Sequence, residues 1–248
     1  MALLTLNGVS LCYHSTKGET QALQDVTFSV EEGEFFGIVG PSGSGKTTIL
    51  SLVAGLLTPS SGRISFDGRE KRTGYMLQRD HLFEWRTIEQ NVLLGLEIEG
   101  RLNAETKNKA SVLLEKYGLG EFKRRHPSEL SGGMRQRVAL IRTLVTDPDI
   151  LLLDEPFSAL DFVTRLSVVN DVFGIIKDEK KTAMLVTHDI SEAISMCDKI
   201  AMLTARPAVV KRIFDTGFSR EMPIKRRESE RFSRQFEKIW KEMENVCS

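Results

Sequence analysis

The segment GPSGSGKT, residues 40–47, has the residue types and spacing of a loop that holds phosphate groups. Its pattern, G-x-x-x-x-G-K-[ST], is matched by Gly40, Gly45, Lys46 and Thr47. Glycines let consecutive backbone N–H groups turn toward phosphate oxygens, the lysine reaches the β and γ phosphates, and the threonine hydroxyl can bind Mg²⁺. The segment therefore predicts a nucleotide-binding loop.

A second candidate for chemistry is the apolar run ILLLDEP, residues 150–156, which ends in two acids. A buried strand of this kind delivers Asp154 to the edge of a sheet, where its carboxylate can join the Mg²⁺ shell. Glu155 is the next residue and points elsewhere, so it can orient or deprotonate an attacking water. A merely solvated strand end is the alternative, but acids directly after four buried apolar residues favour a functional role.

Two polar residues, His188 and Gln78, also follow apolar stretches. Taken alone, each is more typical of an ordinary strand end with local hydrogen bonds. A further segment, LSGGMRQRV, places Ser131, Gly132 and Gly133 at an expected helix start, where a hydroxyl and backbone amides form an anion site. The chain thus carries two candidate anion sites.

The apolar pattern predicts the elements that position these residues. VTFSV alternates inward at Val26, Phe28 and Val30, EFFGIVG is a short buried strand, and a helix with apolar positions as far as Leu57 follows the glycine-rich loop. Strand, loop and helix in this order are the context that a phosphate loop requires. The later runs ILLLD, AMLVTH and KIAML indicate further strands of a mostly parallel α/β sheet.

Between residues 86 and 146 the sequence becomes charged and amphipathic, which predicts an inserted helical subdomain. We expect residues 1–85 and 147–205 to form the α/β core and residues 206–248 to form a C-terminal extension. The extension ends in a helix with one apolar face, and docking on the body is favoured over binding a partner. The basic run at residues 225–227 is expected to be solvated, in preference to contacting lipid headgroups. The apolar face comprises Phe232, Phe236, Ile239, Trp240 and Met243.

Composition limits the class of protein. The 248 residues are 41% apolar, and 34 Lys and Arg balance 34 Asp and Glu, so no overall field indicates nucleic acid. Cys12, Cys197 and Cys247 show no paired metal-ligand spacing, fit reduced thiols in the cytosol and receive no chemical role. Neither a signal peptide nor a membrane-spanning run is present, so we expect a protein that is soluble when isolated and reaches a membrane only through a partner.

Five segments together resemble the motifs of the ATP-binding cassette ATPases, in that family's order and over about residues 4–202. They are GPSGSGKTT, Gln78, LSGGMRQR, LLLDEPFSALD and VTHD. The resemblance implies an α/β fold: a P-loop NTPase (RecA-like) core with a mostly parallel sheet, antiparallel β strands near the N-terminus and an inserted α-helical subdomain. It also implies an ATPase that uses ATP and Mg²⁺.

The resemblance implies a role for each matched residue. Tyr13 would stack on adenine, Glu155 would be the general base, and His188 would contact the γ phosphate. Gln78 would sense the metal and the transport partner, sharing the Mg²⁺ shell with Thr47 and Asp154. Asp161, in SALD, would communicate between subunits. The phosphate loop would comprise Gly40, Pro41, Ser42, Gly43, Ser44, Gly45, Lys46, Thr47 and Thr48.

In this family Ser131, Gly132 and Gly133 of one subunit would close over ATP held by another. One set of motifs occurs here, so the chain needs a second copy or a paralogue, and we expect a homodimer that ATP closes and hydrolysis reopens. Met134 departs from the glutamine common at its position, without an evident reason.

Three functions remain open: the ATPase of a transporter, an ATPase acting on DNA or ribosomes, and a non-hydrolysing scaffold. The short span between Gln78 and Ser131 leaves no room for the long coiled coil of DNA-repair members. Members that act on ribosomes usually carry two cassettes in one chain, whereas this chain has one. The presence of Glu155 and His188 disfavours a non-hydrolysing scaffold. A transporter, with no nucleic-acid partner, is favoured.

EWRTIEQNVLLGLE and TARPAVV resemble the importer branch for nitrate, sulfonate and taurine, although Glu84 replaces a usual proline. That likeness implies membrane permease subunits, an extracytoplasmic solute-binding protein and a place at the cytoplasmic membrane face. Phe83 and Trp85 are expected either to line a groove for the permease or to lie in the subdomain core, and the sequence does not separate these two.

Overall fold

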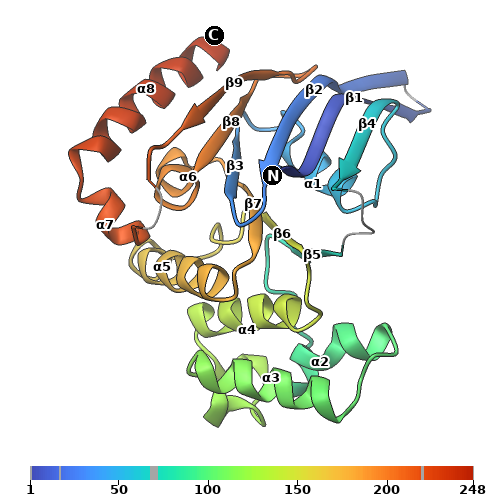
Figure 1. Cartoon of the computed structure of the whole chain (residues 1–248), viewed down its shortest axis with the longest axis vertical. Coiled ribbons are helices and arrows are strands. Elements are labelled where there is room, and N and C mark those ends of the chain that lie inside the picture. The colour runs from blue at the N-terminus through green and yellow to red at the C-terminus, as the bar shows by residue number, and fades with distance from the viewer. Residues whose placement is uncertain (1, 17, 68–71, 219–220, 248) are drawn as a thin grey trace.

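The computed structural model describes residues 2–16, 18–67, 72–218 and 221–247, and its strands form two sheets (Figure 1). The smaller sheet is antiparallel, with β1 (Ala2–Ser15) between β2 (Gly18–Glu31) and β4 (Ser61–Phe66). In β2, Val26, Phe28 and Val30 are buried, as their alternation predicts. The antiparallel strands expected near the N-terminus are therefore confirmed.

The larger sheet has the strand order β5-β6-β7-β3-β8-β9. All neighbouring pairs are parallel except β8 and β9, which run antiparallel. Every residue of β3, β6 and β7 is buried. One face of the larger sheet packs against helices, and the other packs against the smaller sheet and the apolar residues of 49–53. The bounds are β3 (Phe35–Val39), β5 (Thr73–Met76), β6 (Ile150–Asp154), β7 (Thr182–Val186), β8 (Lys199–Leu203) and β9 (Val210–Asp215).

Two expectations from the apolar pattern are wrong in detail. The helix after the phosphate loop, α1 (Lys46–Val53), ends before Leu57, because Gly55 adopts a positive φ of 73° that turns the chain away. Strand β9 was not expected within residues 206–248. It is an edge strand in which Phe214 alone is buried, so it carries no clear apolar alternation.

Three helices lie together at the lower end of Figure 1: α2 (Ile88–Ile98), α3 (Ala104–Lys116) and α4 (Gly132–Leu144). They enclose their own apolar cluster, which includes Ile88, Leu96 and Leu114. Short 3₁₀ turns, Gly120–Phe122 and Pro127–Glu129, connect α3 to α4. The helical part therefore has a core separate from the two clusters that flank the larger sheet.

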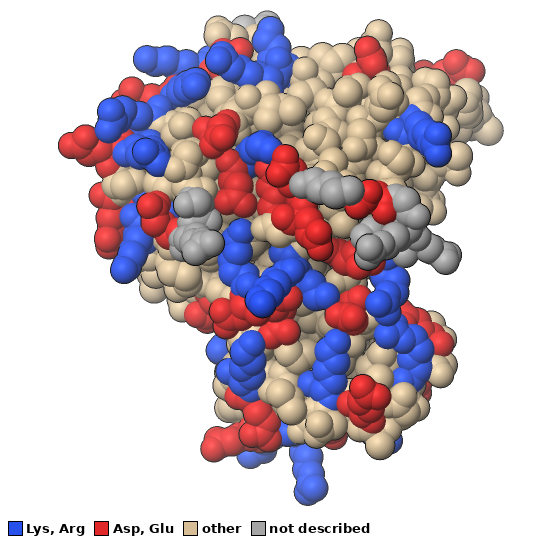
Figure 2. Space-filling view, in the orientation of Figure 1, with Lys and Arg blue, Asp and Glu red and all other residues tan. Residues whose placement is uncertain are grey.

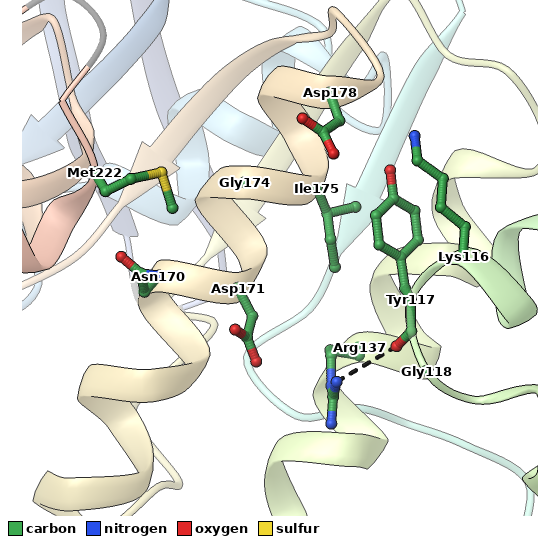
Figure 3. A pocket seen from close by; sticks show the side chains of 10 residues that line it. All are labelled: Lys116, Tyr117, Gly118, Arg137, Asn170, Asp171, Gly174, Ile175, Asp178 and Met222. Carbon is green, nitrogen blue, oxygen red and sulfur yellow. Dashed lines mark hydrogen bonds between the residues drawn. The ribbon is translucent and has the colours of Figure 1, made fainter.

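The helical part meets the sheet-bearing part along α5 (Phe162–Asp178). Glu179, just beyond α5, accepts hydrogen bonds from Lys116 Nζ at 2.7 Å and from the Tyr117 hydroxyl at 2.6 Å. Figure 3 shows the adjacent cavity of about 370 Å³, where Arg137 of α4 donates to the carbonyl of Tyr117 and faces α5. Polar contacts around this hollow supplement the apolar packing of α4 on α5, which includes Leu140 and Val169.

The remaining helices pack on the same face of the larger sheet as α5. They are α6 (Ile190–Met196), α7 (Pro223–Arg227) and α8 (Glu230–Cys247). Ile239 of α8 is fully buried, whereas Trp240 is 49% exposed and stacks on Phe236 with ring centroids 6.0 Å apart. The apolar face of α8 thus lies against the body, with Trp240 at its margin.

Arg226 corrects the expectation of a solvated basic run at residues 225–227. Its guanidinium is fully buried, lies over the rings of Phe173 and Phe218 at 5.0 and 5.3 Å, and donates to the carbonyl of Cys197 at 3.1 Å. Arginine tolerates such burial because its planar group stacks on aromatic rings while its N–H groups find acceptors. Elsewhere, Figure 2 shows acidic and basic side chains interspersed on the face drawn, so neither sign covers it.

Candidate nucleotide-binding site

The glycine-rich loop lies between β3 and α1, in the context that its sequence predicts. Gly43 and Gly45 have φ values of 76° and 92°, which other residues adopt only with strain. Lys46 is 6% exposed, and its ammonium donates to the carbonyls of Gly40 and Pro41 at 3.0 Å each. Burial lowers the pKa of Lys46, while the nearby acids Glu155 and Asp154 oppose this shift. A cation is thus held at the start of α1.

Asp154 lies at the end of β6 and accepts two hydrogen bonds. The Thr47 hydroxyl donates to Oδ1 at 3.0 Å, and the Tyr75 hydroxyl donates to Oδ2 at 3.2 Å. Burial raises the pKa of Asp154, and repulsion from Glu155 adds to it, while the two hydrogen bonds oppose the rise. Sequence reasoning missed Tyr75, although its place in a short strand three residues before Gln78 is a signal.

Glu155, Gln78 and His188 come together from three strand ends. The Glu155 carboxylate lies 3.1 Å from His188 Nδ1 and accepts from Gln78 Nε2 at 3.4 Å. Glu155 has a φ of 44°, an uncommon conformation for a residue with a side chain. Its backbone N–H donates to the carbonyl of Val186 at 2.9 Å, which fixes this turn. The bend directs Glu155 away from Asp154 and toward the other two residues.

Tyr13 lies on β1 beside the phosphate loop. Its ring is 41% exposed, and its hydroxyl is 3.2 Å from the Thr48 hydroxyl. An exposed aromatic face next to a phosphate site can stack on a base. The geometry is compatible with an adenine platform.

A cavity of about 380 Å³ opens over the phosphate loop. Arg206, which sequence reasoning did not single out, contributes to its wall, and its Nε donates to the carbonyl of Gly43. The sequence offers one sign of this role, because Arg206 is a basic residue three positions after β8, a strand that ends beside the phosphate loop. The lining residues are Ser42, Gly43, Gly45, Lys46, Thr47, Thr48, Glu155 and Arg206.

Ser131 lies apart from this cavity. It caps the N-terminus of α4, where its hydroxyl accepts from the N–H of Met134 at 3.3 Å. Figure 1 shows α4 in the helical part and α1 in the upper, sheet-bearing part. Residues 131–133 are absent from the lining of the cavity over the phosphate loop. The two candidate anion sites of one chain are therefore not brought together.

The structure explains other residues of the LSGGMRQRV segment. Met134 packs against the apolar cluster of the helical part, which a glutamine would fill less well. Arg135 pairs with Asp80 at 3.0 Å, and Arg137 donates to the Tyr117 carbonyl. These arginines therefore bind within their own chain. At this helix start Ser131 is exposed, Gly132 is partly buried and Gly133 is buried.

Asp161 caps the N-terminus of α5 and accepts from the N–H of Thr164 at 3.0 Å. Hydrogen bonds from Thr164 hold the pKa of Asp161 below its usual range. The next two residues, Phe162 and Val163, are 68% and 76% exposed. The helix start thus presents a charged cap and two apolar side chains at the surface.

The residues over the loop fit a nucleotide triphosphate with Mg²⁺. Thr47 and Asp154 offer two oxygen atoms side by side, the ligand type that Mg²⁺ prefers. Ser44 is 1% exposed, and its hydroxyl oxygen has no hydrogen-bond partner among the described residues. A bound phosphate would supply one.

Comparisons with known proteins agree with this geometry. A family model described as ABC transporter matches residues 23–158. The chain is 47% identical to YtlC of Bacillus subtilis, an uncharacterized ABC transporter ATP-binding protein, over 99% of this chain and 97% of that protein. It is 40% identical to SsuB of Bacillus licheniformis, an aliphatic sulfonates import ATP-binding protein, over 92% and 89%.

A solved structure is also similar. The ATP-binding cassette MJ0796, a dimer in a post-hydrolysis state with ADP and Pi, superposes with a TM-score of 0.70 at 30% identity, covering 86% of this chain and 98% of that one. Within residues 2–16, 18–67, 72–218 and 221–247, no helix is both long and apolar enough to cross a membrane.

Proposed function

The chain belongs to the ABC transporter family and is an ATPase, and on that premise we propose that it powers an importer for a small sulfonate-like solute. The observation that carries the proposal is the arrangement at the phosphate loop, where Lys46 and Glu155 line one cavity and the nearby charge of Asp154 acts on Lys46. A separate groove on the helical part is lined by the exposed Trp85. ATP binding would close a dimer, and hydrolysis to ADP and phosphate would reopen it.

The proposed roles follow the geometry. Lys46 and the loop amides of residues 40–48 bind the β and γ phosphates, and Tyr13 stacks on adenine. Glu155 accepts a proton from the attacking water, while His188 and Gln78 hold its carboxylate and the γ phosphate in place. Thr47, Asp154 and Gln78 would hold Mg²⁺. When bound, this ion neutralises charge that develops on the phosphate oxygens.

The second subunit would complete the site. Ser131, Gly132 and Gly133 do not line the cavity over their own phosphate loop, so we propose that they contribute to the ATP of another copy. Asp161 would lie near the same junction. The dimeric MJ0796 cassette supports this arrangement. We propose a homodimer built of α/β cores at 1–85 and 147–205, helical parts at 86–146 and extensions at 206–248.

A groove on the helical part is the proposed permease contact. Its volume is about 600 Å³, and its lining includes Trp85, Leu93 and Leu102 beside the charged Glu89 and Lys107. Trp85 is 74% exposed and touches Phe83 with ring centroids 4.8 Å apart. Burial of Trp85 in the subdomain core is therefore ruled out. A mixed apolar and charged groove suits an amphipathic helix of a membrane subunit at the cytoplasmic face.

The groove can be tested with Trp85→Ala. We expect solute uptake to fall at least about tenfold, because exposed tryptophans in grooves carry much of an interface's binding energy. The ATPase activity of the isolated chain should stay unchanged. Ile98→Ala is the control, since Ile98 is also exposed but does not line the groove. Normal uptake by Trp85→Ala would exclude the groove as the permease contact.

The solute class is supported by SsuB-type relatives. Solute selection would rest with a separate binding protein outside the membrane. A strain that lacks this chain should fail to grow with an aliphatic sulfonate as its sole sulfur source and should grow normally with sulfate. Wild type should restore growth, and Glu155→Gln should not. Growth of the deletion strain on every sulfonate tested would overturn the solute class, while rescue by Glu155→Gln would overturn the need for hydrolysis.

A further inference from the structure

The β1–β2 hairpin gathers three side chains of types that bind transition metals, and we propose that Cys12, His14 and Glu19 form a site for Zn²⁺ or a similar divalent ion. One ligand atom from each residue lies within 4.8 Å of the other two. Within the part of the chain that the structure describes, no other group of three or more His, Cys, Asp or Glu meets this spacing. Sequence spacing alone assigned Cys12 no chemistry, because Glu19 joins it only through strand pairing.

Strand geometry places the three side chains on one face. Cys12 and His14 are two residues apart on β1, so they point to the same side. Glu19 of β2 is the direct cross-strand partner of His14, which puts its side chain on that side as well. The His14 Nδ1 atom is 3.1 Å from Glu19 Oε1. Two strands therefore present sulfur, nitrogen and oxygen ligands to one point.

The ligand set selects the metal. Zinc bonds of about 2.3 Å to sulfur and about 2.1 Å to nitrogen or oxygen imply ligand atoms about 3.3–3.6 Å apart in a tetrahedron. The present spacing thus requires only a contraction of about 1 Å in the widest pair. A thiolate favours zinc, cobalt or cadmium over magnesium and calcium. The side chains of His14 and Glu19 are 70% and 71% exposed, which leaves water access to a fourth position.

The three proposed ligands interact only weakly with other groups of the protein. The Cys12 thiol lies 3.9 Å from the carbonyl oxygen of Tyr13, which makes only a weak hydrogen bond. The ion pair of His14 and Glu19 is exposed and contributes little to stability. A thiolate and a carboxylate together balance the charge of one divalent ion. Little is therefore lost when a metal replaces these contacts.

The site has a consequence for Tyr13, which stands between two of the ligands. Adjacent residues on a strand point to opposite faces, so a metal on one side of β1 fixes the strand that carries the Tyr13 ring on the other. The Tyr13 hydroxyl already contacts Thr48 of the phosphate loop at 3.2 Å. Zinc should therefore tighten nucleotide binding by restricting the hairpin. This consequence rests on the proposed function, whereas the metal site does not.

Cobalt titration tests the site directly. The full-length chain should carry Cys247→Ser, which removes the C-terminal thiol, and Cys197 is fully buried. One equivalent of Co²⁺ should produce thiolate-to-cobalt charge-transfer absorption and intense bands of four-coordinate cobalt, which Zn²⁺ displaces. Cys12→Ser should abolish the charge-transfer band. His14→Ala and Glu19→Gln should each weaken Co²⁺ binding more than about tenfold.

Gln21→Ala is the matched control, because Gln21 pairs with Cys12 across the same hairpin and is exposed. It should bind Co²⁺ as well as the parent does. The absence of cobalt bands, or their survival in Cys12→Ser, would overturn the site. Nucleotide affinity measured with and without Zn²⁺ tests the coupling separately. An unchanged affinity in a chain that binds Zn²⁺ would overturn the coupling alone, and a chain that binds no ATP under either condition would overturn the proposed function.

Discussion

Glu155 is held from two sides by His188 and Gln78, so the direction of its carboxylate is fixed. Replacement of its carboxylate by an amide keeps the size and the neighbours but removes the basic group. Glu155→Gln should therefore retain ATP binding while turnover falls by about 10²–10⁴-fold, the usual contribution of a general base. Fluorescent-nucleotide binding and phosphate release measure the two properties. Turnover near the wild-type rate would remove Glu155 from this role.

Asp154 provides a test of pH dependence. Because its pKa is raised in the folded protein, the folded state resists losing this proton, and the free energy of unfolding decreases as pH rises from the unfolded pKa to the folded one. Asp154→Asn has no proton to lose at this position, so it avoids this decrease in the free energy of unfolding. In EDTA and without nucleotide, the variant should be more stable than wild type at neutral pH, and the gain should vanish below about pH 4.

Urea unfolding at several pH values measures the effect of Asp154→Asn. An Asn variant that is less stable than wild type across the whole pH range would contradict the prediction. The same variant should lose ATPase activity, so stability and activity would change in opposite directions at this position.

Sequence reasoning identified chemistry at single residues more readily than contacts. Lys46, Asp154 and Glu155 were predicted because their motifs are contiguous. In the structure Lys46 and Glu155 line one cavity, and Asp154 accepts a hydrogen bond from Thr47 of the same lining. Arg206 and Tyr75 were missed, since each reaches the site only through the pairing of strands distant in sequence. The proposed metal-binding role of Cys12 did not follow from the sequence for the same reason, since Glu19 joins it only through strand pairing.

At the scale of elements, two glycines that are adjacent in sequence meet different surroundings. A side-chain carbon at Gly133 would lie 2.8 Å from Val168 Cγ2 of α5, whereas one at Gly132 would lie 3.2 Å from Leu160 Cδ2, the tip of a side chain that can move. Gly133→Ala should therefore reduce the free energy of unfolding by about 1–3 kcal/mol, as overpacking does. Gly132→Ala is the control and should change it less. Urea unfolding of both variants decides this, and equal stabilities would contradict it.

Asn91 braces the segment that presents Trp85. The Asn91 side chain is fully buried and accepts from the Phe83 N–H at 2.7 Å. Its amide group lies 3.0–3.1 Å from three carbonyl oxygens, those of Phe83, Arg86 and Thr87. An apolar residue of similar size would leave these backbone groups buried without partners.

Asn91→Leu should therefore lower the free energy of unfolding by about 2–3 kcal/mol. It should also loosen residues 83–87, which the fluorescence of Trp85 reports in a Trp240→Phe background. An emission spectrum and stability equal to those of the parent would show that Asn91 does not hold this loop.

Helices and strands could be predicted where apolar residues form a continuous run or recur at a regular spacing. The buried runs of β3, β6 and β7 follow from their sequences alone. Strand β9 and the burial of Arg226 did not follow, because both depend on what tertiary packing places beside them. Trp85 remained ambiguous until its exposure was known, since an aromatic residue suits a core and a groove equally well.

At the scale of the whole molecule, the proposed dimer requires each chain to supply its phosphate loop to one site and residues 131–133 to the other. A mixture of subunits with Lys46→Ala and subunits with Ser131→Arg should therefore recover ATPase activity that neither variant has alone. With equal amounts, half of the dimers are mixed and each has one intact site, so we expect roughly a quarter of the wild-type rate. Each variant mixed with itself is the control. No recovery in dimers shown to be mixed would exclude sharing between subunits.

The distance between the phosphate loop and the start of α4 has a kinetic consequence. In the proposed dimer, a subunit that has bound ATP must meet a second one before hydrolysis, so the rate in dilute solution should rise with the square of the subunit concentration. Two subunits docked on one permease would be held at millimolar effective concentration, and the encounter would become intramolecular. Futile hydrolysis by free subunits would then be suppressed by dilution alone, with no inhibitor required.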